Sequence, residues 1–170
     1  MRDLGFLAEL TLKRRLKLAR YSASVNGTAL STTTGLLTIG TAATGAGSVV
    51  ALQEVLLGGE AAASAVVRFA LNRPSADPTG AATAQTTQKL NPASANATFV
   101  VATAYATTQG TLSTNDVIIL PFNAFGGVVR WLAAPGEEII VGTQGAVAYL
   151  IGRSRSGTST VSGHYVMEEL

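Results

Sequence analysis

The fold of this 170-residue chain is decided by residues 48–71, SVVALQEVLLGGEAAASAVVRFAL. The first half of this stretch is mostly apolar and ends at Gly58-Gly59, as a buried strand before a turn would. The second half has the two-residue period of a strand, with Val67, Phe69 and Leu71 on one face. The strands predicted here are Ser48–Leu57 and Ala65–Leu71.

The rest of the chain after residue 25 repeats this pattern of short strands between turn residues, and no segment in it has a helical period. Pro121 has no N–H group, so its run must lie at a sheet edge, a bend or a strand end. Such a series of strands predicts an all-β fold, an antiparallel jelly-roll β-sandwich over residues 21–170. The further predicted strands are Thr98–Tyr105, Val117–Phe122, Gly127–Leu132, Glu137–Val141, Ala146–Ile151 and Val161–Glu168.

Two connections are also predicted within this domain. Asn26-Gly27 has the composition of a tight turn after the first strand. Residues 72–88 contain two prolines and almost no large apolar side chain, which predicts a long loop.

Residues 1–20 form a basic N-terminal arm that differs in charge from the rest of the chain. They hold six basic and two acidic side chains, a net charge of +4, whereas residues 21–170 carry −2. Leu4, Leu7 and Leu10 have helical spacing, but the leucines from Leu10 to Leu18 alternate as in a strand. The arm is therefore expected to be extended or partly helical.

The low charge of the chain indicates a surface that other proteins cover. Only 13% of the residues are charged, compared with about 25% in ordinary soluble domains. A small domain has much surface for its volume, and charged side chains normally solvate it. The alternative is an ordinary soluble sandwich with a neutral surface rich in hydroxyl groups.

The residues that catalysis or metal binding would need are scarce. The chain has no cysteine, so disulfides and thiolate chemistry are impossible, and His164 is its single histidine. We expect His164 to be a polar residue on the solvent or interface face of the last strand, opposite Tyr165 and Met167. The acidic pairs 137–138 and 168–169 are expected at solvated strand ends, and Asp77, Asp116 and Glu54 are isolated in the sequence. No enzyme activity and no cofactor are predicted.

The basic run of the arm is the candidate binding segment. It could contact nucleic-acid phosphates, an anionic membrane or acidic patches on protein, and it could also be a disordered tail. Leucines between the charges favour protein, while the scarcity of aromatic side chains argues against direct nucleic-acid contact. No apolar run reaches the roughly 18 residues that span a bilayer, and the first residues lack the order of a signal peptide. The predicted partner-binding residues are Lys13, Arg14, Arg15, Leu16, Lys17 and Arg20.

Five segments carry a resemblance to a known family: RYSAS at 20–24, VVALQEVLLGGEAAASAVVRFALNRP at 49–74, KLNPASA at 89–95, VVRWLAAPGEEIIV at 128–141 and SGHYVMEE at 162–169. Together they resemble the capsid decoration, or cement, proteins of phages, which are small virion proteins of the jelly-roll type. The resemblance covers about residues 20–170. It implies a homotrimer on the outer surface of an icosahedral capsid, bracing the major capsid protein, with no catalytic residues and no small-molecule substrate. Such a protein is made in the host cytoplasm.

Three functions follow from these observations. The leading hypothesis is a decoration protein whose sandwich forms a homotrimer and whose arm grips the shell. The alternative is a receptor- or carbohydrate-binding sandwich of a tail fibre or spike, although such sites usually present exposed aromatic rings and Trp131 lies in an apolar strand. The single histidine argues against the third, a jelly-roll metalloenzyme.

Overall fold

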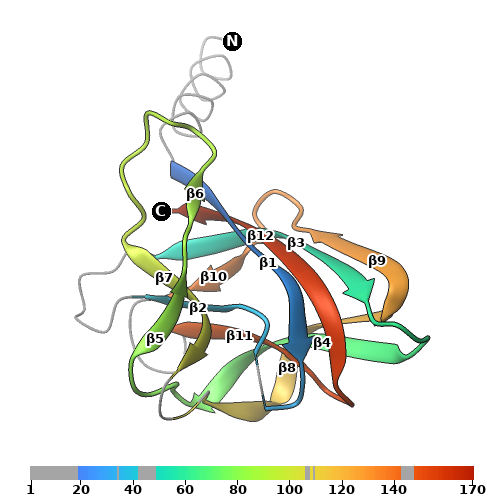
Figure 1. The fold of residues 1–170 in the computed structure, drawn as a ribbon. Helices are drawn as coiled ribbons and strands as arrows, with labels where there is room; N and C mark the ends of the chain where they lie inside the picture. The colour runs from blue at the N-terminus through green and yellow to red at the C-terminus, as the bar shows by residue number, and fades with distance from the viewer. Residues whose placement is uncertain (1–18, 34, 42–48, 106–107, 109, 143–147) are drawn as a thin grey trace, which may run out of the picture.

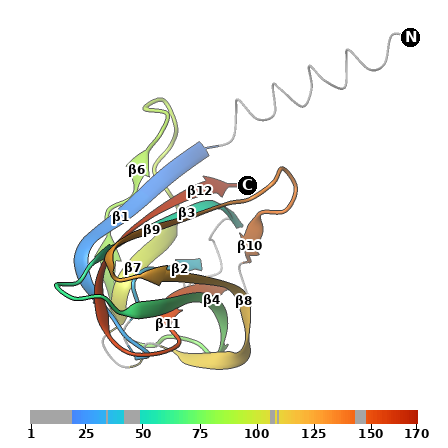
Figure 2. The same cartoon turned by 90° about the vertical axis from the view of Figure 1, so that its right-hand side faces the viewer.

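The computed structural model describes residues 19–33, 35–41, 49–105, 108, 110–142 and 148–170. Within these residues the chain forms twelve strands and no helix, and the strands make two antiparallel six-stranded sheets. The prediction of an all-β antiparallel fold is confirmed. Figure 1 shows the two sheets, and Figure 2 shows them turned by 90°.

Sheet 1 has the order β10-β3-β12-β1-β6, and β9 also pairs with β3. One edge of β3 pairs with β12 along its length. The other edge pairs with β10 through residues 50–52 and with β9 through residues 54–60. The strands of sheet 1 are β1 (Ala19–Leu30), β3 (Val50–Glu60), β6 (Gln88–Lys89), β9 (Phe125–Leu132), β10 (Ile139–Val141) and β12 (Ser159–Glu169).

Sheet 2 has the order β5-β7-β2-β11-β4-β8, so that β8 is an edge strand. Pro121 lies in β8, which is consistent with the prediction that its run lies at a sheet edge, a bend or a strand end. The strands of sheet 2 are β2 (Thr38–Thr41), β4 (Val66–Ala76), β5 (Ala82–Gln85), β7 (Phe99–Tyr105), β8 (Thr111–Asn123) and β11 (Tyr149–Ser154).

One hydrophobic core is shared by both sheets. Tyr165 of β12 and Phe69 of β4 are fully buried in it. The buried face predicted from the sequence is confirmed in both strands. In β4, Val67, Phe69 and Leu71 are buried while Val66 is 71% exposed, although Ala70 on the other face is buried as well. Val161, Tyr165 and Met167 likewise share the buried face of β12.

A tight corner carries the chain from sheet 2 to sheet 1 between β8 and β9. Gly59 and Gly127 are pressed against this corner. A Cβ atom on Gly59 would lie 2.2 Å from the Ala124 carbonyl oxygen, and one on Gly127 would lie 2.3 Å from the Asn123 carbonyl oxygen. Glycine is therefore required at both positions by close backbone approach.

Two of the predicted connections are wrong. Asn26-Gly27 is not a turn but a bulge inside β1, where the register with β12 shifts between Val25 and Thr28 and Gly27 has φ +55°. A glycine with positive φ occurs in β-bulges as well as in turns, so the Asn-Gly dipeptide alone does not distinguish the two structures. Residues 72–88 are not one loop, because they contain the end of β4, β5 and β6. Their small side chains fit the edges of the two sheets, where little apolar surface is buried.

The arm lies almost wholly outside the described residues, which begin at Ala19. Ala19 and Arg20 belong to β1, where they pair with Glu169 and Glu168 of β12. The C-terminus therefore lies beside the start of β1, as Figures 1 and 2 show.

Candidate protein-binding surface

The predicted binding residues Lys13, Arg14, Arg15, Leu16 and Lys17 lie outside the described residues. Arg20, the last of the set, is the second residue of β1. Its side chain is 44% exposed, and its Nε lies 3.5 Å from Oε2 of Glu168, the residue directly opposite on β12. The described part of the chain thus begins beside a buried carboxylate.

The outer face of sheet 1 is the first candidate surface, and we call it the sheet 1 face. It consists of the side chains on β9, β3, β12 and β1 that alternate with core residues and point away from sheet 2. Its members are Arg20, Ser22, Ser24, Glu54, Leu56, Gly58, Val128, Arg130, Leu132, Ser162, His164, Val166 and Glu168.

The apolar part of the sheet 1 face lies over β3 and β9. Val128 is 71% exposed and Leu132 is 60% exposed, while Leu56 is half-buried. A shallow groove of about 210 Å³ runs between Leu56, Val128 and His164. Two such exposed aliphatic side chains on one strand leave apolar area in contact with water, which favours a partner that covers them.

The charges on the sheet 1 face neutralise each other. Arg130 Nε donates to Glu54 Oε1 at 2.6 Å, and this hydrogen bond raises the pKa of the Arg130 guanidinium. Arg20 and Glu168 form the second pair. The face therefore has no net charge from these four groups, and a partner need not supply a strong opposite charge.

His164 occupies the place that the sequence predicted for it. It is half-buried on the sheet 1 face, while Tyr165 and Met167 point into the core. Its Nδ1 shares a hydrogen bond of 2.8 Å with the hydroxyl of Ser24 on β1. This contact links two neighbouring strands.

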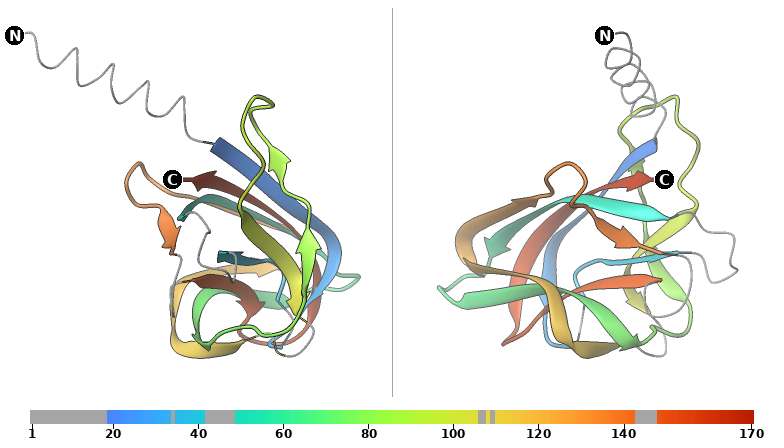
Figure 3. Two further views of the ribbon diagram at one scale, coloured as in Figure 1. Left: turned by 90° about the vertical axis from the view of Figure 1, so that its left-hand side faces the viewer. Right: turned by 180° about the vertical axis from the view of Figure 1, so that it is seen from behind.

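A second feature, the arm-root hollow, lies at the end of sheet 1 where β1 begins. It has a volume of about 330 Å³. Three exposed apolar side chains line it, Leu132, Ile140 and Leu170, with exposed fractions of 60%, 41% and 54%. Arg20, Glu138 and Glu168 supply its charges. Figure 3 shows the loop between β9 and β10 beside the C-terminus.

Three hydrogen bonds to backbone carbonyls hold the walls of the arm-root hollow in place. The Glu137 N–H donates to the Ala134 carbonyl at 2.9 Å and closes a turn through Pro135 and Gly136, in which Gly136 has φ +89°. The Leu170 N–H donates to the Val49 carbonyl at 2.9 Å. Arg73 of sheet 2 donates to the Ile140 carbonyl at 2.6 Å.

Glu168 corrects the expectation that both acidic pairs lie at solvated strand ends. Its side chain is buried, and it accepts a hydrogen bond from the Gln53 amide besides the ion pair with Arg20. The cause is a bulge in β3, where the register with β12 shifts and Gln53 faces the carboxylate. Glu169 accepts hydrogen bonds from Thr98. Glu137 is exposed and Glu138 is half-buried.

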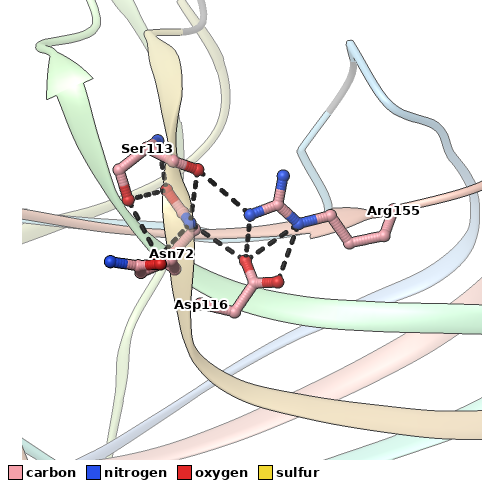
Figure 4. A network of polar contacts seen from close by, with 5 residues as sticks. Asn72, Ser113, Asp116 and Arg155 are labelled. Atoms are coloured by element: carbon pink, nitrogen blue, oxygen red, sulfur yellow. Dashed lines mark hydrogen bonds and ion pairs between the residues drawn. The ribbon is translucent and has the colours of Figure 1, made fainter.

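Asp116 and Glu54 are not isolated in the fold, although they are in the sequence. Asp116 of β8 accepts hydrogen bonds from Arg155 Nη2 at 2.5 Å and from the Asn72 amide at 2.9 Å. Asn72 in turn accepts from the Ser113 N–H at 2.9 Å. Figure 4 shows how this network ties edge strand β8 to β4 and to the residue after β11. Its role is structural.

The described residues offer no evident site for a metal ion. No group of three or more His, Asp or Glu side chains among them could hold one. None of the described segments is a helix long and apolar enough to cross a bilayer. The chain matches no protein-family model, and no curated protein and no solved structure is significantly similar to it.

Proposed function

We infer that this chain is a virion structural protein that decorates and stabilises an icosahedral phage capsid. In this proposal it is an antiparallel jelly-roll β-sandwich that binds the major capsid protein as a homotrimer on the outer surface of the shell. The observation that carries the proposal is the sheet 1 face, a broad sheet surface with internally paired charges and exposed Val128 and Leu132.

The jelly-roll description is supported by the strand arrangement. Two six-stranded antiparallel sheets share one core, and the β8–β9 corner carries the chain from one sheet to the other. Chains that alternate between two antiparallel sheets in this way are typical of jelly rolls.

The composition of the sheet 1 face suits weak contacts that are repeated by symmetry on a capsid shell. Each contact with the shell would bury a modest apolar area over β3 and β9, and serine side chains would add little entropy loss. A homotrimer repeats this contact three times, so weak single contacts add to strong overall binding. The few charged side chains avoid the desolvation cost of burying unpaired ions.

The tail-fibre or spike alternative has less support. Carbohydrate sites usually present exposed aromatic rings, and Trp131 instead packs against the hydrophobic core. Phe125 is exposed by 60%, but it lies at the β8–β9 corner and not on the sheet 1 face. Binding to a glycan array without binding to capsids would favour this alternative.

A matched pair of substitutions tests the proposal. Val128 and Val66 are each 71% exposed, but Val66 lies on the outer face of sheet 2. We expect Val128→Lys to weaken co-sedimentation with capsids that lack the protein by about tenfold or more, and Val66→Lys to leave it unchanged. Equal binding by both variants would exclude the sheet 1 face as the capsid-binding surface. No binding by the unmodified chain would exclude the capsid-decoration function itself.

A further inference from the structure

We propose that the arm-root hollow of one copy receives the basic, leucine-rich arm, residues 1–18, of a neighbouring copy. The inference rests on the proposed homo-oligomer and names the contact that joins its copies. It replaces the expectation that the arm grips the shell. The shell would then be bound by the part of the sheet 1 face around Leu56, Val128 and His164, because Arg20, Leu132 and Glu168 of that face also line the hollow.

The arm-root hollow has the chemistry of a site for an amphipathic basic segment. Leu132, Ile140 and Leu170 offer apolar contacts that no described residue covers. Glu138 and Glu168 face one cation, Arg20, so one negative charge is left in excess. A segment that alternates leucine with lysine or arginine matches this combination.

The arm supplies such a segment. Residues 13–17 read Lys-Arg-Arg-Leu-Lys, and leucines stand at positions 10, 12, 16 and 18. An exposed leucine side chain gains roughly 1.5–3 kcal/mol when it is fully buried. Cations placed beside carboxylates add specificity and speed association more than they add affinity. The leucines would therefore provide the affinity and the charges would set the orientation.

The direction of the chain favours a neighbouring copy over the arm's own domain. Arg20 pairs with Glu168 and lines the hollow, and a segment that continued the direction of β1 before Ala19 would run past the end of the sheet. To enter its own hollow, the arm would have to reverse at once and cross β12. Sharp reversals use Gly, Pro, Asn, Asp or Ser, and residues 6–18 contain none of these.

The arm is long enough to reach another molecule. Eighteen residues span about 27 Å as a helix and about 60 Å when extended. Both lengths are comparable to or greater than the width of a small domain. Reciprocal exchange of arms around a symmetry axis would close the oligomer without leaving any hollow empty.

Engineered cysteines can locate the arm, because the natural chain has none. Full-length copies with Leu16→Cys are mixed with differently tagged copies that carry Leu132→Cys in the hollow or, as a control, Val66→Cys on sheet 2. We expect the Leu16–Leu132 disulfide to form between copies about tenfold faster than the Leu16–Val66 disulfide. Equal rates would overturn the proposal. So would cross-linking confined to single molecules that carry both Leu16→Cys and Leu132→Cys.

A charge test adds an independent readout. Glu138 lines the hollow, whereas its exposed neighbour Glu137 does not. We expect Glu138→Lys to raise the dissociation constant of the oligomer about tenfold, and Glu137→Lys to change it little. Combining Glu138→Lys with Arg14→Glu/Arg15→Glu in the same chain makes every contact between an arm and a hollow complementary again, so association should be restored. Equal effects of the two glutamate variants, or no restoration, would contradict arm exchange.

The two proposals fail separately. If the cysteines join copies but the protein ignores capsids, arm exchange stands and the decoration function fails. If capsids are bound but the arm cross-links to the shell and not to Leu132, the function stands and arm exchange fails.

Discussion

Gly152 of sheet 2 lies directly against Tyr165 of sheet 1, in the middle of the shared core. A Cβ atom on Gly152 would be 2.3 Å from the Tyr165 hydroxyl oxygen and 2.6 Å from Cζ of Phe69. The two sheets are therefore as close at this point as their side chains allow. The Tyr165 hydroxyl is also buried without a hydrogen-bond partner.

We predict that Gly152→Ala destabilises the domain by about 1–3 kcal/mol, because overpacking forces the tyrosine or the backbone to move. Urea denaturation measures the change. The control is Gly58→Ala, since a Cβ atom there would meet nothing within 4 Å. The explanation would be wrong if the two variants were equally stable. Adding Tyr165→Phe to Gly152→Ala should recover part of the loss, because it removes the nearest clashing atom.

Tyr165→Phe alone should leave the stability at pH 7 unchanged or slightly raised, because it removes a buried hydroxyl that makes no hydrogen bond. Its effect should appear at high pH. Burial raises the pKa of Tyr165 above its ordinary value of 10.0. The unfolded chain then releases this proton first, so the folded state loses stability as the pH rises above about 10.

The measurement is the urea midpoint between pH 8 and pH 11. The unmodified protein should lose stability more steeply above about pH 10 than Tyr165→Phe does, by up to about 1.4 kcal/mol per pH unit. Some slope should remain in the variant, because desolvation by burial also raises the pKa of Tyr21 and of Tyr149. Identical curves would show that Tyr165 ionises without unfolding.

Asp116→Ala should destabilise the domain by about 2–4 kcal/mol, because it leaves Arg155 and the Asn72 amide without their shared acceptor. The Asp116 side chain is only 9% exposed. The matched control is Glu54→Ala, which breaks the pair with Arg130, whose side chain is 59% exposed. That change should be too small to measure by denaturation. If Glu54→Ala lost more stability than Asp116→Ala, our conclusion that the Asp116–Arg155 pair contributes more to stability than the Glu54–Arg130 pair would be wrong.

Deleting residues 2–18 should leave the free energy of unfolding of the isolated domain nearly unchanged, because the paired strand β1 begins at Ala19. The same deletion should lower the mass of the oligomer in light scattering and weaken capsid binding through lost avidity. Circular dichroism checks that the strands remain. An oligomer of unchanged mass would show that the arm does not join the copies.

The sequence was informative where side chains alternate and uninformative where distant segments meet. Val67, Phe69 and Leu71 revealed the buried face of β4 because a strand has a two-residue period. Asn26-Gly27 misled, since its left-handed glycine serves a bulge within β1.

The arm-root hollow had no signal in the sequence. It joins Arg20, the loop between β9 and β10, and the last residues of the chain, which come together only through the pairing of β1, β12 and β3. The partner of Asp116 was hidden for the same reason, because Arg155 is 39 residues away. The burial of Glu168 was not predicted, because the bulge in β3 that brings Gln53 to it cannot be recognised from the spacing of residues in the sequence.

The pairing of Ala19 with Glu169 has a practical consequence for engineering. A short flexible linker from Leu170 could rejoin the chain at β1, and the exposed turn at Pro135-Gly136 could then be opened to create new ends. Such a circular permutant would keep every strand of both sheets. It would also move the attachment point of a fused fluorescent protein or peptide tag from the ends of β1 and β12 to the turn between β9 and β10.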